Sequence, residues 1–292
     1  MDSTSIFLIL VGVLFLLAIS DLVVGVSNDA INFLNSAIGA KAASFRVIMI
    51  VAAVGIFIGA TSSAGMMEIA RKGIFHPEYF YFREIMIIFL AVMITDVILL
   101  DFFNTIGLPT STTVSIVFEL LGAAFAIALV YYLRGNMIEV NGVMQVGSVQ
   151  DYINNEKALQ IILGILLSII IAFTLGAIIQ WLSRLVFTFR YEKVLRYAGG
   201  VWGGLAITSI VYFLMIKGAK GASFMSEEVV NYITGNTTKL LLISFVSFSI
   251  FFQILTFFIK KYVLNIIVLV GTFALAMAFA GNDLVNFIGV PL

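Results

Sequence analysis

The chain contains no cysteine and a single histidine, His76, among its 292 residues. Without cysteine there is no disulfide, no thiolate metal site and no cysteine nucleophile, and one histidine excludes a histidine-rich metal centre. Charged residues make up only 11%, against about 25% in average globular proteins, and the formal net charge is zero. A neutral chain has no long-range field that would attract nucleic acid, so we expect no nucleic-acid partner.

Apolar residues are abundant instead, at 62% of the chain, with a mean hydropathy of +1.14. So little polar surface predicts an integral protein of the lipid bilayer. Apolar stretches of about 20 residues, rather than alternating segments of about ten, predict membrane-spanning helices and not a β-barrel. The N-terminus lacks the basic region and cleavage site of a signal peptide, so we expect the first span to be retained and favour a bacterial inner membrane.

Expected spans cover about 5–26, 45–70, 84–103, 158–185, 197–216, 240–259 and 262–280, with one more before a solvated loop at 134–157. The second span carries a small-residue face, Gly55-x-x-x-Gly59, which we expect to pack against another helix.

A polar cluster follows the first span directly. Within Ser27–Ala40 stand the carboxylate Asp29 and the carboxamides Asn28, Asn32 and Asn35. Such groups cost several kcal/mol in hydrocarbon unless they face protein or a watery cavity, so the cluster predicts a substrate or ion pathway. The glycine- and alanine-rich residues that follow allow an unwound or re-entrant backbone.

The same motif recurs 254 residues later. Asn282, Asp283, Asn286 and Phe287 repeat the order found at Asn28, Asp29, Asn32 and Phe33. Two copies after two apolar runs suggest internal duplication, as in many secondary transporters, although a motif this short could recur by chance. We interpret residues 1–292 as a single transmembrane domain, with a first repeat and linking spans over 1–216 and the start of a second repeat over 240–292.

A second polar centre lies at Asn104–Ser115. Gly107 and Pro109 interrupt helical hydrogen bonding there, and hydroxyl side chains follow at once. Pro109 could occupy the first turn of a new helix, whose N–H groups and positive dipole end suit an oxyanion. A simple kink, with hydroxyls bonded back to carbonyls, is the alternative. Glu119, further along, could serve as a coupling residue or as the partner of a buried polar group.

These motifs together resemble the inorganic phosphate transporter family, the symporters often called PiT. Ser27-Asn28-Asp29-Ala30-Ile31-Asn32 is similar to that family's Gly-Ala-Asn-Asp-x-x-Asn signature, and 107–113 (Gly-Leu-Pro-Thr-Ser-Thr-Thr) is similar to its Gly-Leu-Pro-x-Ser-Thr-Thr. Gly281–Asn286 resembles the opening of the family's second repeat.

The resemblance implies an all-α, polytopic transporter bundle with inverted repeats and broken or re-entrant helices. Such a protein moves inorganic phosphate by symport with sodium ions or protons, commonly as a homodimer, and uses no other cofactor. The substrate-binding residues implied are Asn28, Asn32, Ser111, Thr112, Thr113, Asn282 and Asn286. Asp29 and Asp283 would repel phosphate, so their expected role is to hold sodium or a proton, with Glu119 as a further coupling candidate.

Two departures from the family pattern stand out. Val114 occupies the place of a histidine that commonly follows the Thr-Thr pair, and a second Gly-Leu-Pro-x-Ser-Thr-Thr is missing. The sequence therefore reads as one that ends early, and the alternatives are a non-transporting half that needs a partner chain, or a transporter of sulfate or another tetrahedral oxyanion. No histidine-backed nucleophile, metal cluster or Walker loop occurs, so we expect no enzyme.

Overall fold

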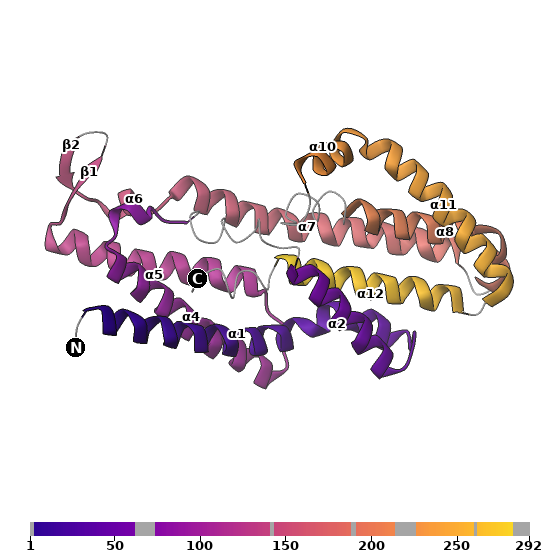
Figure 1. Cartoon of the computed structure of the whole chain (residues 1–292), viewed down its shortest axis with the longest axis horizontal. Coiled ribbons are helices and arrows are strands. Elements are labelled where there is room, and N and C mark those ends of the chain that lie inside the picture. Colours follow the sequence, from indigo (N-terminus) through magenta and orange to yellow (C-terminus); the bar gives the residue numbers. More distant parts are fainter. Residues whose placement is uncertain are drawn as a thin grey trace. The chain divides into compact units, whose positions relative to one another are not determined.

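The computed structural model describes residues 3–61, 74–140, 143–187, 191–213, 226–259 and 262–282 (Figure 1). These residues are almost all helical, which confirms the predicted fold class. In chain order the elements are α1 (Ser3–Gly39), α2 (Phe45–Thr61), the 3-10 helix η1 (Pro77–Tyr79), α4 (Phe82–Ile106), α5 (Thr112–Arg134), β1 (Met137–Val140), β2 (Val143–Val146), α6 (Val149–Tyr152), α7 (Asn155–Val186), α8 (Tyr191–Phe213), α10 (Glu227–Gly235), α11 (Thr237–Ile259) and α12 (Val263–Asn282).

Seven of the described helices are long and apolar enough to cross a bilayer: α1, α4, α5, α7, α8, α11 and α12. Helix α2, with 17 residues, is shorter. Large apolar side chains on these helices point outward, among them Phe173 with 78% of its surface exposed and Phe258 with 81%. Lipid is the solvent that such surfaces suit, and the chain is an integral, multi-pass membrane protein.

The first of two compact units contains α1 up to Ile31, helices α4 to α6 and α7 up to Ser168. Helices α4 and α5 form an antiparallel hairpin, since Phe80 stacks on Tyr131 at one end and Ser115 bonds to Asp96 nearer the other. Helix α1 runs parallel to α4. Phe7 contacts Phe82, with ring centroids 5.3 Å apart, and further along both helices Asn28 contacts Asn104.

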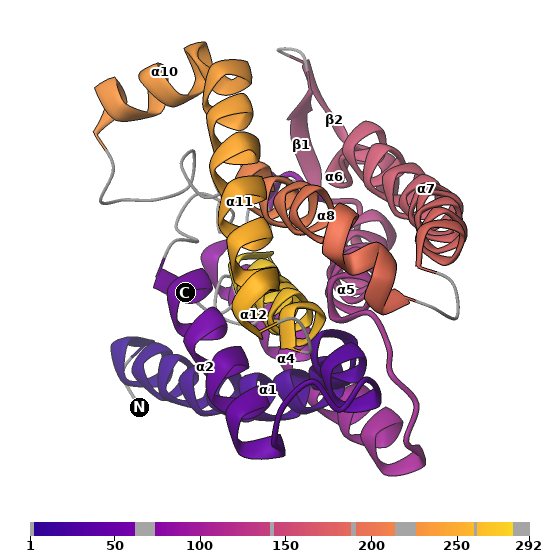
Figure 2. The same ribbon diagram turned by 90° about the vertical axis from the view of Figure 1, so that its right-hand side faces the viewer.

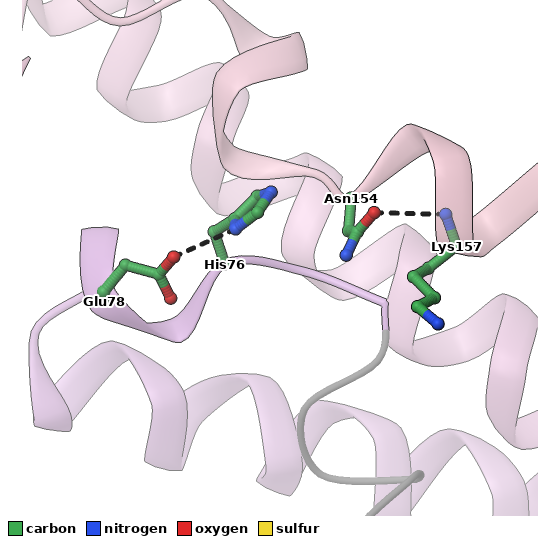
Figure 3. Close-up of polar contacts among 4 residues, drawn as sticks. All are labelled: His76, Glu78, Asn154 and Lys157. Carbon is green, nitrogen blue, oxygen red and sulfur yellow. Dashed lines mark hydrogen bonds and ion pairs between the residues drawn. The ribbon is translucent and has the colours of Figure 1, made fainter. Parts of the chain in front are cut away.

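A short extended segment, residues 74–76, lies at the end of the hairpin where α4 begins and α5 ends. Phe75 pairs with Ile153 in an antiparallel bridge, and the N–H of His76 donates to the carbonyl of Tyr152 at 2.9 Å. His76 Nδ1 lies 3.0 Å from Glu78 Oε1, and Asn154 Oδ1 accepts from the Lys157 N–H at 3.1 Å where α7 begins. Figure 3 shows both contacts. The expected solvated loop therefore carries structure: the β1–β2 hairpin, α6 and this bridge.

The second unit contains the rest of α1, α2, the remainder of α7, α8, and α10 to α12. Here α2 packs along α12 and α8 along α11 (Figure 2). A Cβ placed on Gly55 or Gly59 would collide with the backbone of α12, and one on Gly204 with Ser249 of α11. Small residues thus allow close backbone approach, and the Gly55–Gly59 face serves helix packing, as expected.

The expectation of an unwound backbone after the Asn-Asp motif is wrong. Helix α1 continues without a break to Gly39, and Ser27 Oγ donates to the Val23 carbonyl, 2.7 Å away, inside the helix. The alanines, leucine and isoleucine between the amides favour helix, so the chain turns only afterwards, where Lys41 has a φ of 50°. The second expected span is described only to Thr61, and its remainder lies outside the described residues.

The α2–α12 contact makes a measurable prediction. Gly59→Ala should lower the melting temperature of the purified protein, because the new Cβ meets the Met277 carbonyl oxygen and the Cβ of Ala280, and overpacking of this kind costs about 1–3 kcal/mol. Gly271→Ala in α12 is the matched control, since its Cβ would meet no atom within 4 Å. Alanine there should stabilise the helix by about 0.5–1 kcal/mol. Equal effects of the two changes would contradict the packing.

Candidate functional site

The connection between α4 and α5 is a defined turn. Gly107 ends α4 in the left-handed conformation, with φ of 70°, and its N–H donates to the Asn104 carbonyl at 3.1 Å. Glycine is suited to this place because side chains disfavour that conformation. Ser111 caps α5, its Oγ accepting from the Val114 N–H at 3.4 Å. Helix α5 begins at Thr112, so Pro109 lies in the connection. The expectation that Pro109 occupies the first helical turn is therefore wrong.

Asn28 holds this connection against α1. Its Nδ2 donates to Asn104 Oδ1 at 2.8 Å and to the Leu108 carbonyl at 3.3 Å, while its Oδ1 accepts from the Thr110 N–H at 2.8 Å. Asn104 in turn donates through Nδ2 to the Val24 carbonyl of α1 at 3.0 Å. Only 4% of Asn28 is exposed. Both ends of its amide are therefore engaged in positioning the connection.

Asp29, the next residue, contacts the beginning of α5. Thr112 Oγ1 donates to Asp29 Oδ2 at 3.1 Å, and both side chains are buried. Thr112 is the first residue of α5, so the carboxylate lies beside the positive end of a helix dipole. The two polar centres recognised in the sequence, 76 to 83 residues apart, thus form one cluster.

The other predicted residues lie as follows. Asn32 is one turn beyond Asn28 on α1 and is exposed, as is Ser111, while Thr113 is half-buried. Glu119 is half-buried two turns into α5, where its Oε1 accepts from Ser115 Oγ at 2.9 Å. Asn282 is the last residue of α12, and its side chain, together with Asp283 and Asn286, lies outside the described part of the chain.

Sequence reasoning did not select four residues that the structure places at or beside this cluster. Asn104 accepts a hydrogen bond from the side-chain amide of Asn28. Asp21 and Asp96 are fully buried carboxylates, and Ser115 Oγ lies 2.6 Å from Asp96 Oδ1. Asp21 and Asp96 could have been selected from the sequence, because acidic residues inside apolar spans are rare and often functional.

Within the described ranges, no three histidine, aspartate or glutamate side chains are arranged to hold a metal ion. A sodium site made by Asp29 with Asp283 stays a prediction, because Asp283 falls outside those ranges.

A sequence profile of the phosphate transporter family matches residues 25–292, a range that includes both Asn-Asp motifs and the 107–113 segment. The chain belongs to the phosphate transporter family. The resemblance drawn from the motifs is thereby confirmed, and the amide cluster of Asn28 and Asn104 lies inside a member of that family.

Comparison of structures supports the same placement. The fold is similar to a solved structure described as the sodium-dependent phosphate transporter, with a TM-score of 0.66 and 19% sequence identity over 96% of this chain. The match covers 66% of that transporter, so this member of the phosphate transporter family spans just under two thirds of its neighbour's length. At this identity the likeness shows a shared fold. A search of curated proteins gave no match.

Proposed function

We propose that this chain takes part in secondary active transport of inorganic phosphate, by symport with sodium ions or protons. The observation that carries the proposal is the buried contact between Asp29 and Thr112 at the start of α5, in a member of the phosphate transporter family. That family is one of transporters, so we infer no enzymatic activity. We place the protein in a bacterial inner membrane, as a homodimer.

The chemistry of the cluster supports an oxyanion. The first turn of α5 offers a positive dipole end, with the hydroxyls of Ser111, Thr112 and Thr113 beside it. Asn32, exposed one turn from Asn28, adds a carboxamide on the same face of α1. We propose these groups, with Asn282 and Asn286 from the second motif, as phosphate ligands, and Asn28 as the residue that positions them.

Charge balance supports a coupling cation. Asp29 alone would repel phosphate, whereas a cation or proton held at its carboxylate would neutralise that charge. Asp283 in the second motif would act in the same way, and Glu119 is the further coupling candidate. The structural neighbour is described as sodium-dependent, which favours sodium as one of the transported ions.

The test is uptake of radiolabelled phosphate into proteoliposomes under a sodium or proton gradient, together with phosphate binding to the purified chain. We expect gradient-dependent uptake that Asp29→Asn lowers by about tenfold or more, the factor that corresponds to 1.4 kcal/mol. Asp101→Asn is the matched control, since Asp101 is an exposed carboxylate on α4.

Each other outcome counts against the proposal. Phosphate binding without uptake would assign the chain the role of a half that needs a partner, and neither binding nor uptake would remove the phosphate assignment altogether. Equal inhibition of uptake by unlabelled sulfate and phosphate would make the substrate a tetrahedral oxyanion in general.

A further inference from the structure

A second buried polar cluster lies deeper along the same three helices. It consists of Asp21 on α1, Asp96 on α4, and Ser115 and Glu119 on α5. Asp21 and Asp96 have no exposed surface, and Ser115 is 8% exposed. Ser115 Oγ contacts Asp96 Oδ1 at 2.6 Å and Glu119 Oε1 at 2.9 Å. We refer to Asp21, Asp96 and Glu119 as the carboxyl triad.

The triad continues the row begun by Asp29 and Thr112. Because α1 is parallel to α4 and α4 is antiparallel to α5, the chain directions place Asp29 beside Thr112 and Asp21 towards Glu119. Eight residues separate Asp21 from Asp29, which is a rise of about 12 Å along α1. The two clusters are therefore neighbours in one polar row and are not the same site.

The carboxyl triad contains several buried oxygen atoms that have no hydrogen-bond partner among the described residues. They are both oxygens of Asp21, Oδ2 of Asp96 and Oε2 of Glu119. The charged groups near enough to interact electrostatically with Asp21 are Asp96 and Glu119, and the one near Glu119 is Asp96. Each of these neighbours is itself acidic. The remaining carboxylates on these helices lie elsewhere: Asp29 accepts from Thr112, Glu84 accepts from the Tyr81 N–H at the start of α4, and Asp101 is exposed.

The three carboxyl groups of the triad cannot all be ionised in this buried cluster unless a cation is bound there. Burying one unpaired carboxylate already costs several kcal/mol, and like charges nearby add to that cost. Two carboxyl groups that share a site resolve the conflict when one of them takes up a proton. Asp96 and Glu119 both contact Ser115 Oγ, so a proton on either carboxyl group can be shared through that hydroxyl.

The contacts of the Ser115 hydroxyl indicate that this cation is a proton. It has a single hydrogen and can donate to Asp96 or to Glu119, but not to both. The other short contact, of 2.6 or 2.9 Å, would then join two oxygen lone pairs unless that carboxyl group itself carries a hydrogen and donates to Ser115 Oγ. We propose that Asp21, Asp96 and Glu119, organised by Ser115, form a proton-binding site inside the membrane.

The position of the carboxyl triad near Asp29 links it to the proposed transport. A proton held by the triad lies along the same helix contact as Asp29, so its uptake or release changes the charge next to the proposed phosphate cluster. This role as the carrier of a coupling proton rests on the proposed function. The binding of a proton by the triad does not, and it can be measured in the absence of phosphate.

The decisive experiment is infrared spectroscopy of the protein reconstituted in lipid at neutral pH. We expect the carbonyl stretch of a protonated carboxyl group, shifted by exchange into heavy water, and a loss of intensity in Asp96→Asn and in Glu119→Gln. These replacements keep side-chain shape and remove charge, so folding should survive, and the melting temperature checks it. Asp101→Asn is the control and should leave the band unchanged.

Three results would overturn the assignment. The band could be absent at neutral pH, it could persist undiminished in both triad variants, or it could disappear when sodium chloride replaces choline chloride, which would make the triad a sodium site. The coupling role is tested separately by phosphate uptake driven by a pH gradient. Asp96→Asn should lower that uptake at least tenfold, and unchanged uptake beside a confirmed band would leave a proton site that plays no part in transport.

Discussion

Asn28→Asp is expected to abolish phosphate uptake and to destabilise the protein by about 3–5 kcal/mol, the cost of leaving a buried charge without its partner. The substitution removes the Nδ2 donor and sets a carboxylate oxygen against Asn104 Oδ1 and the Leu108 carbonyl, both of which are acceptors. It also adds a negative charge directly beside Asp29. The measurement combines a thermal unfolding curve with uptake into proteoliposomes.

Asn35→Asp provides the control for this substitution. Asn35 lies on the same helix and is exposed, so the same chemical change should alter stability by no more than about 0.5 kcal/mol. If Asn28→Asp unfolded at the same temperature as Asn35→Asp, the connection between α4 and α5 would not depend on Asn28 as the hydrogen bonds indicate.

The second large effect is expected for Thr112→Val. Valine keeps the shape of threonine but removes the hydroxyl that donates to Asp29 Oδ2, and a hydrogen bond to a charged group is worth about 1.5–3 kcal/mol. Uptake should fall by about ten- to a hundredfold, with little change in protein yield. Thr105→Val is the control, because Thr105 is exposed on α4.

A double-mutant cycle isolates the contact. Thr112→Val and Asp29→Asn should be less than additive, with a coupling energy of about 1 kcal/mol or more, since each removes the same hydrogen bond. Fully additive losses would mean that Asp29 and Thr112 act independently, and the geometry of the cluster would then not explain its function.

Much of the fold was predictable because a bilayer imposes helix length and apolarity. The spans, both polar centres and the packing face of Gly55 and Gly59 all follow from those two constraints. The continuity of α1 was not predictable in the same way, because amides and small residues in a membrane helix are compatible with either a helix or a break. The structure shows that the side-chain amide of Asn28 bonds to Asn104 and to the connection between α4 and α5, while the backbone of α1 stays helical.

The site was predicted in outline but not in its pairings. Asn28 and Asp29 are adjacent in sequence, yet one binds the connection after α4 and the other binds the first residue of α5. Which partner each residue contacts depends on which face of α1 meets which helix. The sequence alone does not determine the rotation of α1 about its own axis. Asp21 and Asp96 stand far apart in the sequence, inside two different apolar spans, and nothing in the sequence shows that α1 and α4 run in parallel.

The unbroken length of α1 decides how deep each polar group lies. Its 37 residues extend about 55 Å, whereas a helix tilted by as much as about 40° needs only about 39 Å to cross a hydrocarbon layer of about 30 Å. Asp21 is the middle residue of α1, so it lies deepest when the two ends of the helix project equally from the hydrocarbon. Asn28 and Asp29 then lie closer to one surface. On the proposed function, an ion that enters from that surface would meet Asp29 before the carboxyl triad, and the helix would set the order of arrival.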